Sequence, residues 1–322
     1  MILYPWLTKI YNIIIHQHQK KKSHHAILIN TTTGMGIFQL IWNISIWLLC
    51  LNRKGIKSCY SCTGCQLMLS MNHPDWHLIK KKDSEIYDIN SIHNINYKIY
   101  QHSQQGGAKI IVILDIQKLT ESATNALLKT LEEPPENTWF LFVNYNFSYL
   151  HRTLSSRCII YHLITPKEKN SLLWLYKEIG KKNISYLTAL RLNYGSPIST
   201  KKFINGDIWI ERINFLKNLY SSFKNKNLLN MLKILNNNHV IIKINWICLL
   251  LFDAIKFKLN EKNSISNLDQ MPLIQMFSDH YSNTILDNII LNWIKCKYRL
   301  ITIPGINNEL LLLEQLLIWE RI

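Results

Sequence analysis

The sequence predicts an α/β domain with a parallel sheet, followed by an all-helical part. Two continuous apolar runs, Ala26–Asn30 and Ala108–Leu114, have the composition of central strands that are buried on both faces, and a third run spans Trp139–Val143. Between the last two, apolar residues at helical spacing predict a helix over Glu121–Glu133, which ends at a pair of prolines. Strands that alternate with helices are typical of a parallel sheet covered by helices.

Beyond Leu163 the strand signals end and the apolar pattern is helical. A turn-rich loop at 193–197 interrupts the first helical segments. Later helices are predicted at three places: Leu228–Leu235, Trp246–Leu259 and Glu309–Trp319. We therefore expect three domains, at residues 1–163, 164–206 and 207–322. A chain of 322 residues with 48% apolar residues can bury more than one core.

The formal net charge of +16 makes contact with a polyanion such as DNA plausible, because Lys and Arg neutralise phosphates. Lys, Asn and Ile are abundant along the whole chain, which is equally typical of A+T-rich coding that adds lysines without selecting for a partner. Composition alone leaves both interpretations open.

Two apolar segments have some features of targeting or membrane signals, but neither fits one. Ile13–Ile15 is too short for a secretory signal, and the uncharged segment Met35–Leu51 is interrupted by Gln39, Asn43 and Ser45. We interpret Met35–Leu51 as a buried helix. The expectation is a cytoplasmic protein without a membrane span.

Four of the seven cysteines form the pattern Cys-x8-Cys-x2-Cys-x2-Cys at Cys50, Cys59, Cys62 and Cys65. Such spacing lets the thiolates converge on one cation, and four sulfur ligands suit tetrahedral Zn²⁺ best. Because no position is left for water, the predicted role is structural, as a zinc module at residues 50–65. Iron–sulfur ligation is an alternative. His73 is interpreted as a surface or loop residue rather than a ligand.

A loop with Gly34 and Gly36 lies between the first predicted strand and the buried helix, which is the layout of a phosphate loop. An active loop reads Gly-x4-Gly-Lys-Ser/Thr, in which backbone N–H groups and the lysine hold phosphates and the hydroxyl binds magnesium. When Gly36 is aligned with the second glycine, other residue types occupy the remaining positions: Thr31 for the first glycine, Ile37 for the lysine and Phe38 for the hydroxyl residue.

The second nucleotide-binding element is also incomplete. Asp115 ends a predicted strand where an Asp-Glu pair is expected, but Ile116 follows it. The sequence therefore predicts a degenerate phosphate loop and no ATP hydrolysis. Glycines of an ordinary turn are the alternative, which the strand–loop–helix order disfavours.

Two further segments resemble signatures of the AAA+ clamp-loader subunits: Asn125–Pro135 (NALLKTLEEPP) and Leu154–Cys158 (LSSRC). With the cysteine cluster and five shorter motifs in matching order, essentially the whole chain resembles the delta-prime family of bacterial DNA polymerase III. The shorter motifs are Tyr4-Pro5-Trp6, His24-His25-Ala26, Gly106-Gly107-Ala108-Lys109, Gly195-Ser196-Pro197 and Gly305-Ile306-Asn307. The resemblance implies a P-loop-type sheet domain with an inserted zinc module, a small helical lid domain and a C-terminal helical collar domain.

The resemblance also implies a function. The chain would have no intrinsic activity, as a non-catalytic subunit of a DNA-directed DNA polymerase (nucleotidyltransferase) holoenzyme. It would assemble with the gamma or tau ATPases and with delta, and load the sliding clamp on primed DNA during replication. In this family the Ser-Arg-Cys arginine reaches a neighbour's triphosphate, which is carried over to Arg157 between Ser156 and Cys158. A planar, permanently charged guanidinium suits that role.

The sequence also allows two alternative function classes. An active AAA+ ATPase is disfavoured by Ile37, Phe38 and Ile116, and by Ile198, which stands where active relatives carry a sensor arginine after Gly195-Ser196. A zinc-dependent DNA-binding protein is the third hypothesis, motivated by the net charge and the cysteines.

Overall fold

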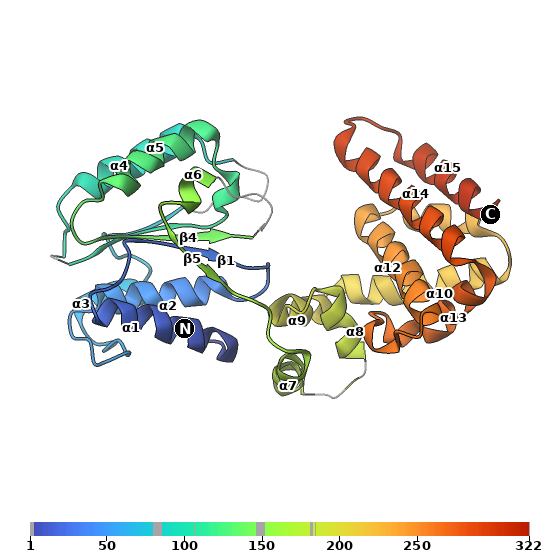
Figure 1. Cartoon of the computed structure of the whole chain (residues 1–322), viewed down its shortest axis with the longest axis horizontal. Coiled ribbons are helices and arrows are strands. Elements are labelled where there is room, and N and C mark those ends of the chain that lie inside the picture. Colours follow the sequence, from blue (N-terminus) through green and yellow to red (C-terminus); the bar gives the residue numbers. More distant parts are fainter. Residues whose placement is uncertain are drawn as a thin grey trace. The chain divides into compact units, whose positions relative to one another are not determined.

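The computed structural model describes residues 3–79, 86–105, 107–145, 152–180, 183 and 185–321. Gly106, part of one resemblance motif, lies outside these residues. The chain divides into two compact units, Met1–Pro166 and Lys167–Ile322 (Figure 1). Among the described helices, none has the length and apolar character needed to cross a lipid bilayer.

The first unit is built on a five-stranded parallel sheet with the strand order β2-β3-β4-β1-β5. The strands are β1 (Ala26–Asn30), β2 (Trp76–Ile79), β3 (Lys109–Ile113), β4 (Thr138–Asn144) and β5 (Ile159–His162). The three predicted strands are confirmed, and β1 and β3 are buried along their whole length. The sequence did not predict β2 and β5, which are the two short edge strands.

Helices cover both faces of this sheet (Figure 1). One side carries α1 (Thr8–Gln19, after the 3-10 turn η1 at Pro5–Leu7), α2 (Ile37–Leu49) and α3 (Thr63–Leu69); the other carries α4 (Ile89–Tyr100), α5 (Glu121–Glu132) and α6 (Arg152–Ser155). Alternate residues of β1 serve the two cores: Ile27 and Ile29 pack with α1 and α2, whereas Leu28 packs with α4 and α5. Nearly every side chain of α2 is buried, which confirms the interpretation as a buried helix.

The second unit is helical throughout its described residues. It begins with α7 (Glu168–Ile179), α8 (Ser185–Leu192) and α9 (Pro197–Asn205), and continues with α10 (Asp207–Lys224), η3 (Leu228–Met231), α11 (Leu232–Leu235), α12 (Val240–Lys258), η4 (Lys262–Ser264), η5 (Leu268–Gln270), α13 (Met271–His280), α14 (Asn283–Thr302) and α15 (Asn308–Glu320). The predicted later helices are confirmed, although α12 begins earlier than expected and the segment at 228–235 combines a 3-10 turn with one short α-turn. The turn-rich loop ends where Pro197 opens α9, a position that tolerates its missing N–H.

A buried polar network fixes the loop before α13. The Arg212 side chain of α10 is fully buried, donates to Asp269 at 2.7 Å and Asn267 at 2.7 Å, and lies over the Trp209 ring. The buried carboxylate of Asp253 in α12 accepts the Asn267 N–H at 2.8 Å. Because these charges are paired and hydrogen-bonded, removing one partner would leave an uncompensated buried charge.

The same loop is held by a residue from the start of the unit. Arg191 in α8 pairs with Glu168, the first residue of α7, at 2.8 Å, and also donates to the carbonyl oxygen of Ile265. One side chain therefore joins the first helices of the second unit to the segment before α13.

Candidate functional site

The loop at residues 31–36 connects β1 to α2 and has a backbone that requires glycine. Gly34 and Gly36 have positive φ angles of 80° and 75°. This left-handed conformation is open to glycine at little cost. Gly36 is the residue directly before α2, so the predicted strand–loop–helix arrangement is confirmed.

The side chains of this loop are part of the core. Met35 is fully buried and Ile37 is 4% exposed, and both pack in the cluster between the sheet and α1. Trp6 covers the loop from the N-terminal segment, since its Nε1 donates to the Met35 carbonyl oxygen at 2.9 Å. The N–H of the buried Thr31 donates to the carbonyl oxygen of Asn144 at 2.9 Å. At the position where an active loop carries a lysine, this chain packs an apolar side chain.

Asp115 lies just beyond β3 and is engaged within its own segment. Its φ of 62° is left-handed, and its carboxylate lies 3.2 Å from Nζ of Lys118. Ile116, in the place of the expected glutamate, is buried and opens the short turn η2 (Ile116–Lys118). The carboxylate that would hold magnesium in an active relative is thus paired with a local ammonium group.

The Ser-Arg-Cys segment forms the turn from α6 to β5. Ser156 Oγ donates to the Thr153 carbonyl oxygen at 2.9 Å, and Cys158 packs against the core under α4 and α5. Burial raises the pKa of the Cys158 thiol to about 12, so this thiol stays protonated at neutral pH. The serine and the cysteine therefore shape the turn, and Arg157 between them lies at the surface with 33% of its side chain exposed.

The Arg157 guanidinium is held by contacts within the chain. Its Nε donates to Glu132 Oε1 at 2.7 Å and its Nη2 contacts the same oxygen, while Nη1 donates to the Thr153 carbonyl oxygen at 3.0 Å. Glu132 is the last residue of α5, and its side chain is 51% exposed. The pairing of Arg157 with Glu132 was not predicted, because no local sequence pattern relates residues that lie 25 positions apart.

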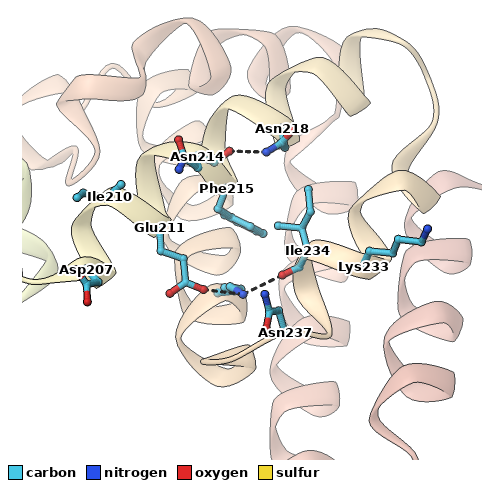
Figure 2. A pocket seen from close by; sticks show the side chains of 10 residues that line it. Asp207, Ile210, Glu211, Asn214, Phe215, Asn218, Lys233, Ile234 and Asn237 are labelled. Carbon is cyan, nitrogen blue, oxygen red and sulfur yellow. Dashed lines mark hydrogen bonds and ion pairs between the residues drawn. The ribbon is translucent and has the colours of Figure 1, made fainter.

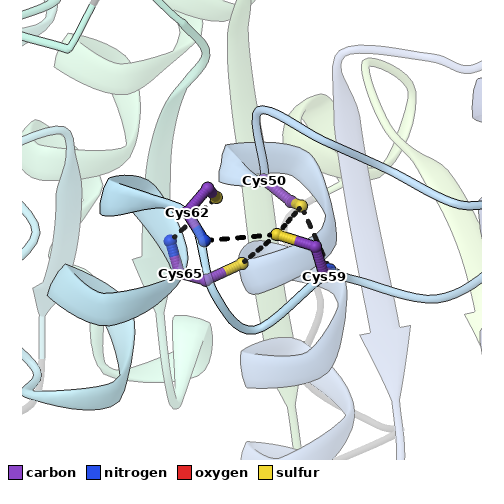
Figure 3. Close-up of side chains that lie close together, drawn as sticks. All are labelled: Cys50, Cys59, Cys62 and Cys65. Carbon is purple, nitrogen blue, oxygen red and sulfur yellow. Dashed lines mark hydrogen bonds between the residues drawn. The ribbon is translucent and has the colours of Figure 1, made fainter.

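The four predicted metal-binding cysteines converge, as Figure 3 shows. Their sulfur atoms all lie within 4.8 Å of one another; the pair Cys50–Cys59 is 3.5 Å apart and the pair Cys59–Cys65 is 3.9 Å apart. Tetrahedral zinc with Zn–S bonds of about 2.3 Å requires sulfur atoms about 3.8 Å apart. Cys50 directly follows α2 and Cys62 caps α3, so the cluster could hold a metal ion between two helix ends.

Backbone N–H groups point at these sulfur atoms. Cys59 N donates to Cys50 Sγ at 3.3 Å, and Cys62 N donates to Cys59 Sγ at 3.3 Å. Hydrogen bonds from the Ser61 and Cys62 N–H groups lower the pKa of Cys59 to about 5, whereas burial raises the pKa of the Cys65 thiol. The positive charge of a divalent cation favours the thiolate form, so that thiols with such different pKa values can be deprotonated together.

The cysteine segment packs closely on the end of α2. A Cβ atom added to Gly64 in α3 would collide with the carbonyl oxygen of Leu49, which explains why only glycine fits there. His73 lies in a loop as expected, but it is buried rather than at the surface, and its Nδ1 accepts the Asp75 N–H at 3.1 Å. It is not one of the four residues whose ligand atoms converge.

The second unit contains a cavity of about 450 Å³ between α10 and the segment that leads into α12 (Figure 2). Among its lining residues, the buried Lys243 pairs with Glu211 at 2.8 Å and donates to the Ile234 carbonyl oxygen at 2.8 Å. The lysine charge is therefore balanced within the fold, as expected for a buried ammonium group. This cavity contains none of the residues that the sequence singled out.

Comparisons with known proteins agree along the chain. Residues 6–167 match the family described as DNA polymerase III, delta subunit, and residues 206–321 match the family described as DNA polymerase III, delta subunit, C terminal. Residues 166–204 match DNA polymerase III subunit delta', AAA+ ATPase lid domain.

Individual relatives cover nearly the full chain. The chain is 58% identical to DNA polymerase III subunit delta' of Buchnera aphidicola subsp. Acyrthosiphon pisum (strain APS), over 100% of this chain and 99% of that protein. It is 35% identical to the same subunit of Escherichia coli (strain K12), over 98% and 94%. A DNA polymerase III gamma subunit-related protein of Thermotoga maritima has a solved structure with 19% identity and a TM-score of 0.49, over 98% and 99%. The chain belongs to the DNA polymerase III delta-prime subunit family, and it combines a parallel-sheet domain, a helical lid of the AAA+ ATPase type and a C-terminal helical domain.

Proposed function

We propose that this chain is the non-hydrolysing subunit of a clamp loader. It assembles with gamma or tau ATPases and with delta, and takes part in loading the sliding clamp on primed DNA. In that assembly Arg157 completes the ATP site of a neighbouring subunit. The observation that carries the proposal is the contrast between a partly exposed guanidinium at Arg157 and a phosphate loop whose Met35 and Ile37 side chains lie in the core.

The absence of intrinsic hydrolysis follows from the chemistry of the loop. A bound triphosphate would meet Ile37 and Phe38 in place of a lysine and a magnesium ligand, and Asp115 is already paired with Lys118. Loss of the lysine removes the charge that offsets the phosphates. Equilibrium binding of magnesium-ATP to the isolated chain tests this point, and tight magnesium-dependent binding would favour the alternative of an active ATPase.

The role of Arg157 follows from its chemistry and position. A guanidinium stabilises the charge that develops on a transferred phosphoryl group, and a residue supplied by another subunit makes hydrolysis depend on assembly. Ser156 and Cys158 support this role because they shape the turn: the Ser156 hydroxyl donates to the Thr153 carbonyl oxygen and accepts from Arg157 Nη1 at 3.4 Å, and the Cys158 thiol is protonated.

The decisive experiment is Arg157→Ala in a reconstituted clamp loader with DNA-stimulated ATPase as the readout. The complex should assemble, and the ATP site that faces this subunit should hydrolyse about 10³- to 10⁵-fold more slowly, the range for an arginine supplied in trans. Arg152→Ala is the matched control, since Arg152 is an exposed arginine of α6 in the same segment. An unchanged rate for Arg157→Ala would contradict the trans-acting role.

We further propose that Cys50, Cys59, Cys62 and Cys65 hold one structural Zn²⁺ per chain. The support is the approach of four sulfur atoms to the spacing of a tetrahedral site, with backbone N–H groups directed at them. Metal analysis of purified Cys59→Ser should show loss of zinc, while Cys248→Ala, in the second unit, should retain it. Full zinc content in Cys59→Ser would refute the assignment.

Finally, we propose the division into an α/β domain (residues 1–163), a lid (164–206) and a collar domain (207–322). An exposed apolar row on α14 supports the collar role: Leu291, Ile294, Tyr298 and Ile301 are 52%, 44%, 67% and 58% exposed and recur at intervals of three and four residues. The double variant Ile294→Glu and Ile301→Glu should weaken assembly without lowering the melting temperature. Unimpaired assembly would exclude this face from the collar.

A further inference from the structure

We propose that Glu132 is an internal counter-ion for Arg157, which occupies the guanidinium in the free subunit and is displaced when Arg157 meets the triphosphate of the neighbouring ATPase. This inference rests on the proposed trans-acting role of Arg157. It assigns to Glu132 a regulatory function in assembly, whereas the proposed function concerns Arg157 alone.

The geometry of the contact shows why displacement is needed. A guanidinium offers two edges for bidentate binding of a phosphate, Nε with Nη2 and Nη1 with Nη2. One oxygen of Glu132 spans the first edge, since both Nε and Nη2 contact it. On the second edge, Nη1 donates to the Thr153 carbonyl oxygen at 3.0 Å. A phosphate therefore cannot take either edge completely while both contacts persist.

The charges near Glu132 also support its role as a counter-ion of Arg157. Glu132 is the last residue of α5, and Glu133 directly follows it. Carboxylates at a helix C-terminus lie beside carbonyl groups with partial negative charge, which is unfavourable unless a cation compensates. Arg157 provides that compensation in the free subunit. A carboxylate that stayed against Arg157 in the assembly would cancel the charge that the triphosphate requires.

The exchange is easy because both side chains are in contact with water. The Arg157 side chain is 33% exposed and the Glu132 side chain is 51% exposed. An ion pair between exposed groups contributes little to stability, and a polyanionic triphosphate is a stronger competitor for the guanidinium. Glu132 therefore slightly raises the subunit concentration at which Arg157 engages the triphosphate, and it does not prevent this contact.

The test compares three variants: Glu132→Gln, Glu133→Gln and Arg157→Ala. Each is titrated into a mixture of the other clamp-loader subunits with ATP and primed DNA, and the ATPase rate is followed against subunit concentration. For Glu132→Gln we expect the concentration that gives half of the maximal rate to fall about two- to five-fold, which is the range for an exposed ion pair. The maximal rate should stay the same, because the carboxylate is displaced in the fully assembled state in both proteins.

Glu133→Gln is the matched control, because it removes the same charge from the next residue, which makes no ion pair with Arg157 in the described part of the chain. It should leave the half-maximal concentration unchanged. In ATP-dependent assembly, the double variant Glu132→Gln with Arg157→Ala should behave like Arg157→Ala alone. If Glu132 had a purely structural role, its substitution would have an effect in both backgrounds.

Three results would overturn the inference: no shift for Glu132→Gln, an equal shift for Glu133→Gln, or a lower maximal rate for Glu132→Gln, which would make Glu132 a residue that aligns Arg157 for hydrolysis. The Arg157→Ala arm separates these outcomes from a failure of the proposed function. If that variant retains the full rate, the trans-acting arginine itself is wrong. If it loses the rate while Glu132→Gln behaves like the wild type, only the counter-ion role is wrong.

Discussion

The two ends of α2 are surrounded by different chemistry. At the N-terminal end, Gly36 follows a loop whose Met35 side chain is fully buried, and the first helical residue, Ile37, is buried as well. At the C-terminal end, Cys50 follows the helix directly and meets three further cysteines. The N-terminus of a helix after a glycine loop is where phosphate-loop proteins bind anions. In this chain that end is packed with apolar side chains, and the ligand-type residues gather at the other end.

This difference shows that the strand–loop–helix arrangement is kept in this chain without the side chains that bind phosphate. The helix still fixes the loop to the sheet, because α2 is buried almost throughout. The guanidinium of Arg157, which we propose to act on phosphate, lies on a turn that belongs to another segment of the first unit. Changes at the two ends of α2 should therefore alter stability and metal content, whereas changes at Arg157 should alter the activity of the assembly.

The largest expected effect is that of metal removal at the C-terminal end. If zinc holds the four cysteines, free zinc at a thousandfold excess over its dissociation constant stabilises the fold by about 4 kcal/mol, because the ion binds only the folded site. A chelator should lower the midpoint of thermal unfolding accordingly. The variant Cys59→Ser with Cys62→Ser should show no response to the chelator. If the chelator leaves the unfolding midpoint of the native protein unchanged as well, the four cysteines hold no stabilising metal ion. The two ends of α2 would then not differ in metal binding.

The second effect concerns the N-terminal end, where Ile37→Lys restores the residue type of an active loop. Because Ile37 is 4% exposed, the new ammonium group would be buried without a partner, and the free energy of unfolding should fall by about 3 kcal/mol or more. Urea unfolding measures the change, and Ile37→Leu should cost less than about 1.5 kcal/mol. No gain of magnesium-ATP binding is expected. A stable variant that binds ATP would show that the loop is one substitution from function.

A smaller effect is expected from Gly64→Ala, where α3 meets the end of α2. The added methyl group would collide with the Leu49 carbonyl oxygen, and overpacking of this kind costs about 1–3 kcal/mol. Both the unfolding free energy and the zinc content should decrease. Gly107→Ala is the control, because a Cβ atom there meets nothing within 4 Å. Equal behaviour of the two variants would mean that the close contact with α2 is unimportant.

The smallest effect is expected from Trp6→Phe. This change removes the hydrogen bond of 2.9 Å from Trp6 Nε1 to the Met35 carbonyl oxygen and leaves an aromatic ring over the loop. The loss of one such bond costs about 1 kcal/mol, measurable by urea unfolding. If stability is unchanged, the N-terminal segment does not brace the loop, and burial of Met35 and Ile37 alone accounts for its packing.

The sequence was sufficient for the centre of the sheet but not for its edges. Continuous apolar runs identified β1, β3 and β4 because those strands are buried on both faces. The edge strands β2 and β5 have only four residues each and are partly exposed, so neither their length nor their apolar pattern separates them from loops. The burial of His73 was missed for a similar reason, since it depends on how the loop before β2 packs.

The candidate sites were predictable to the extent that they are local. The four cysteines converge because close spacing limits where their thiolates can point, and the degenerate loop is evident from residue types at fixed positions. The contact between Glu132 and Arg157 depends on how the end of α5 meets the turn after α6. How α5 and this turn pack against each other depends on the tertiary structure, so it cannot be predicted from one local stretch of sequence.

The position of Arg191 has a mechanical consequence for the second unit. Its guanidinium joins Glu168 at the start of α7 to the Ile265 carbonyl oxygen, and the buried Arg212 anchors the segment just beyond Ile265 to α10. A series of charged contacts therefore connects the first residue of α7, through α8 and the segment before α13, to α10. A displacement of α7 or α8 would have to break these contacts or move the segment before α13 with them.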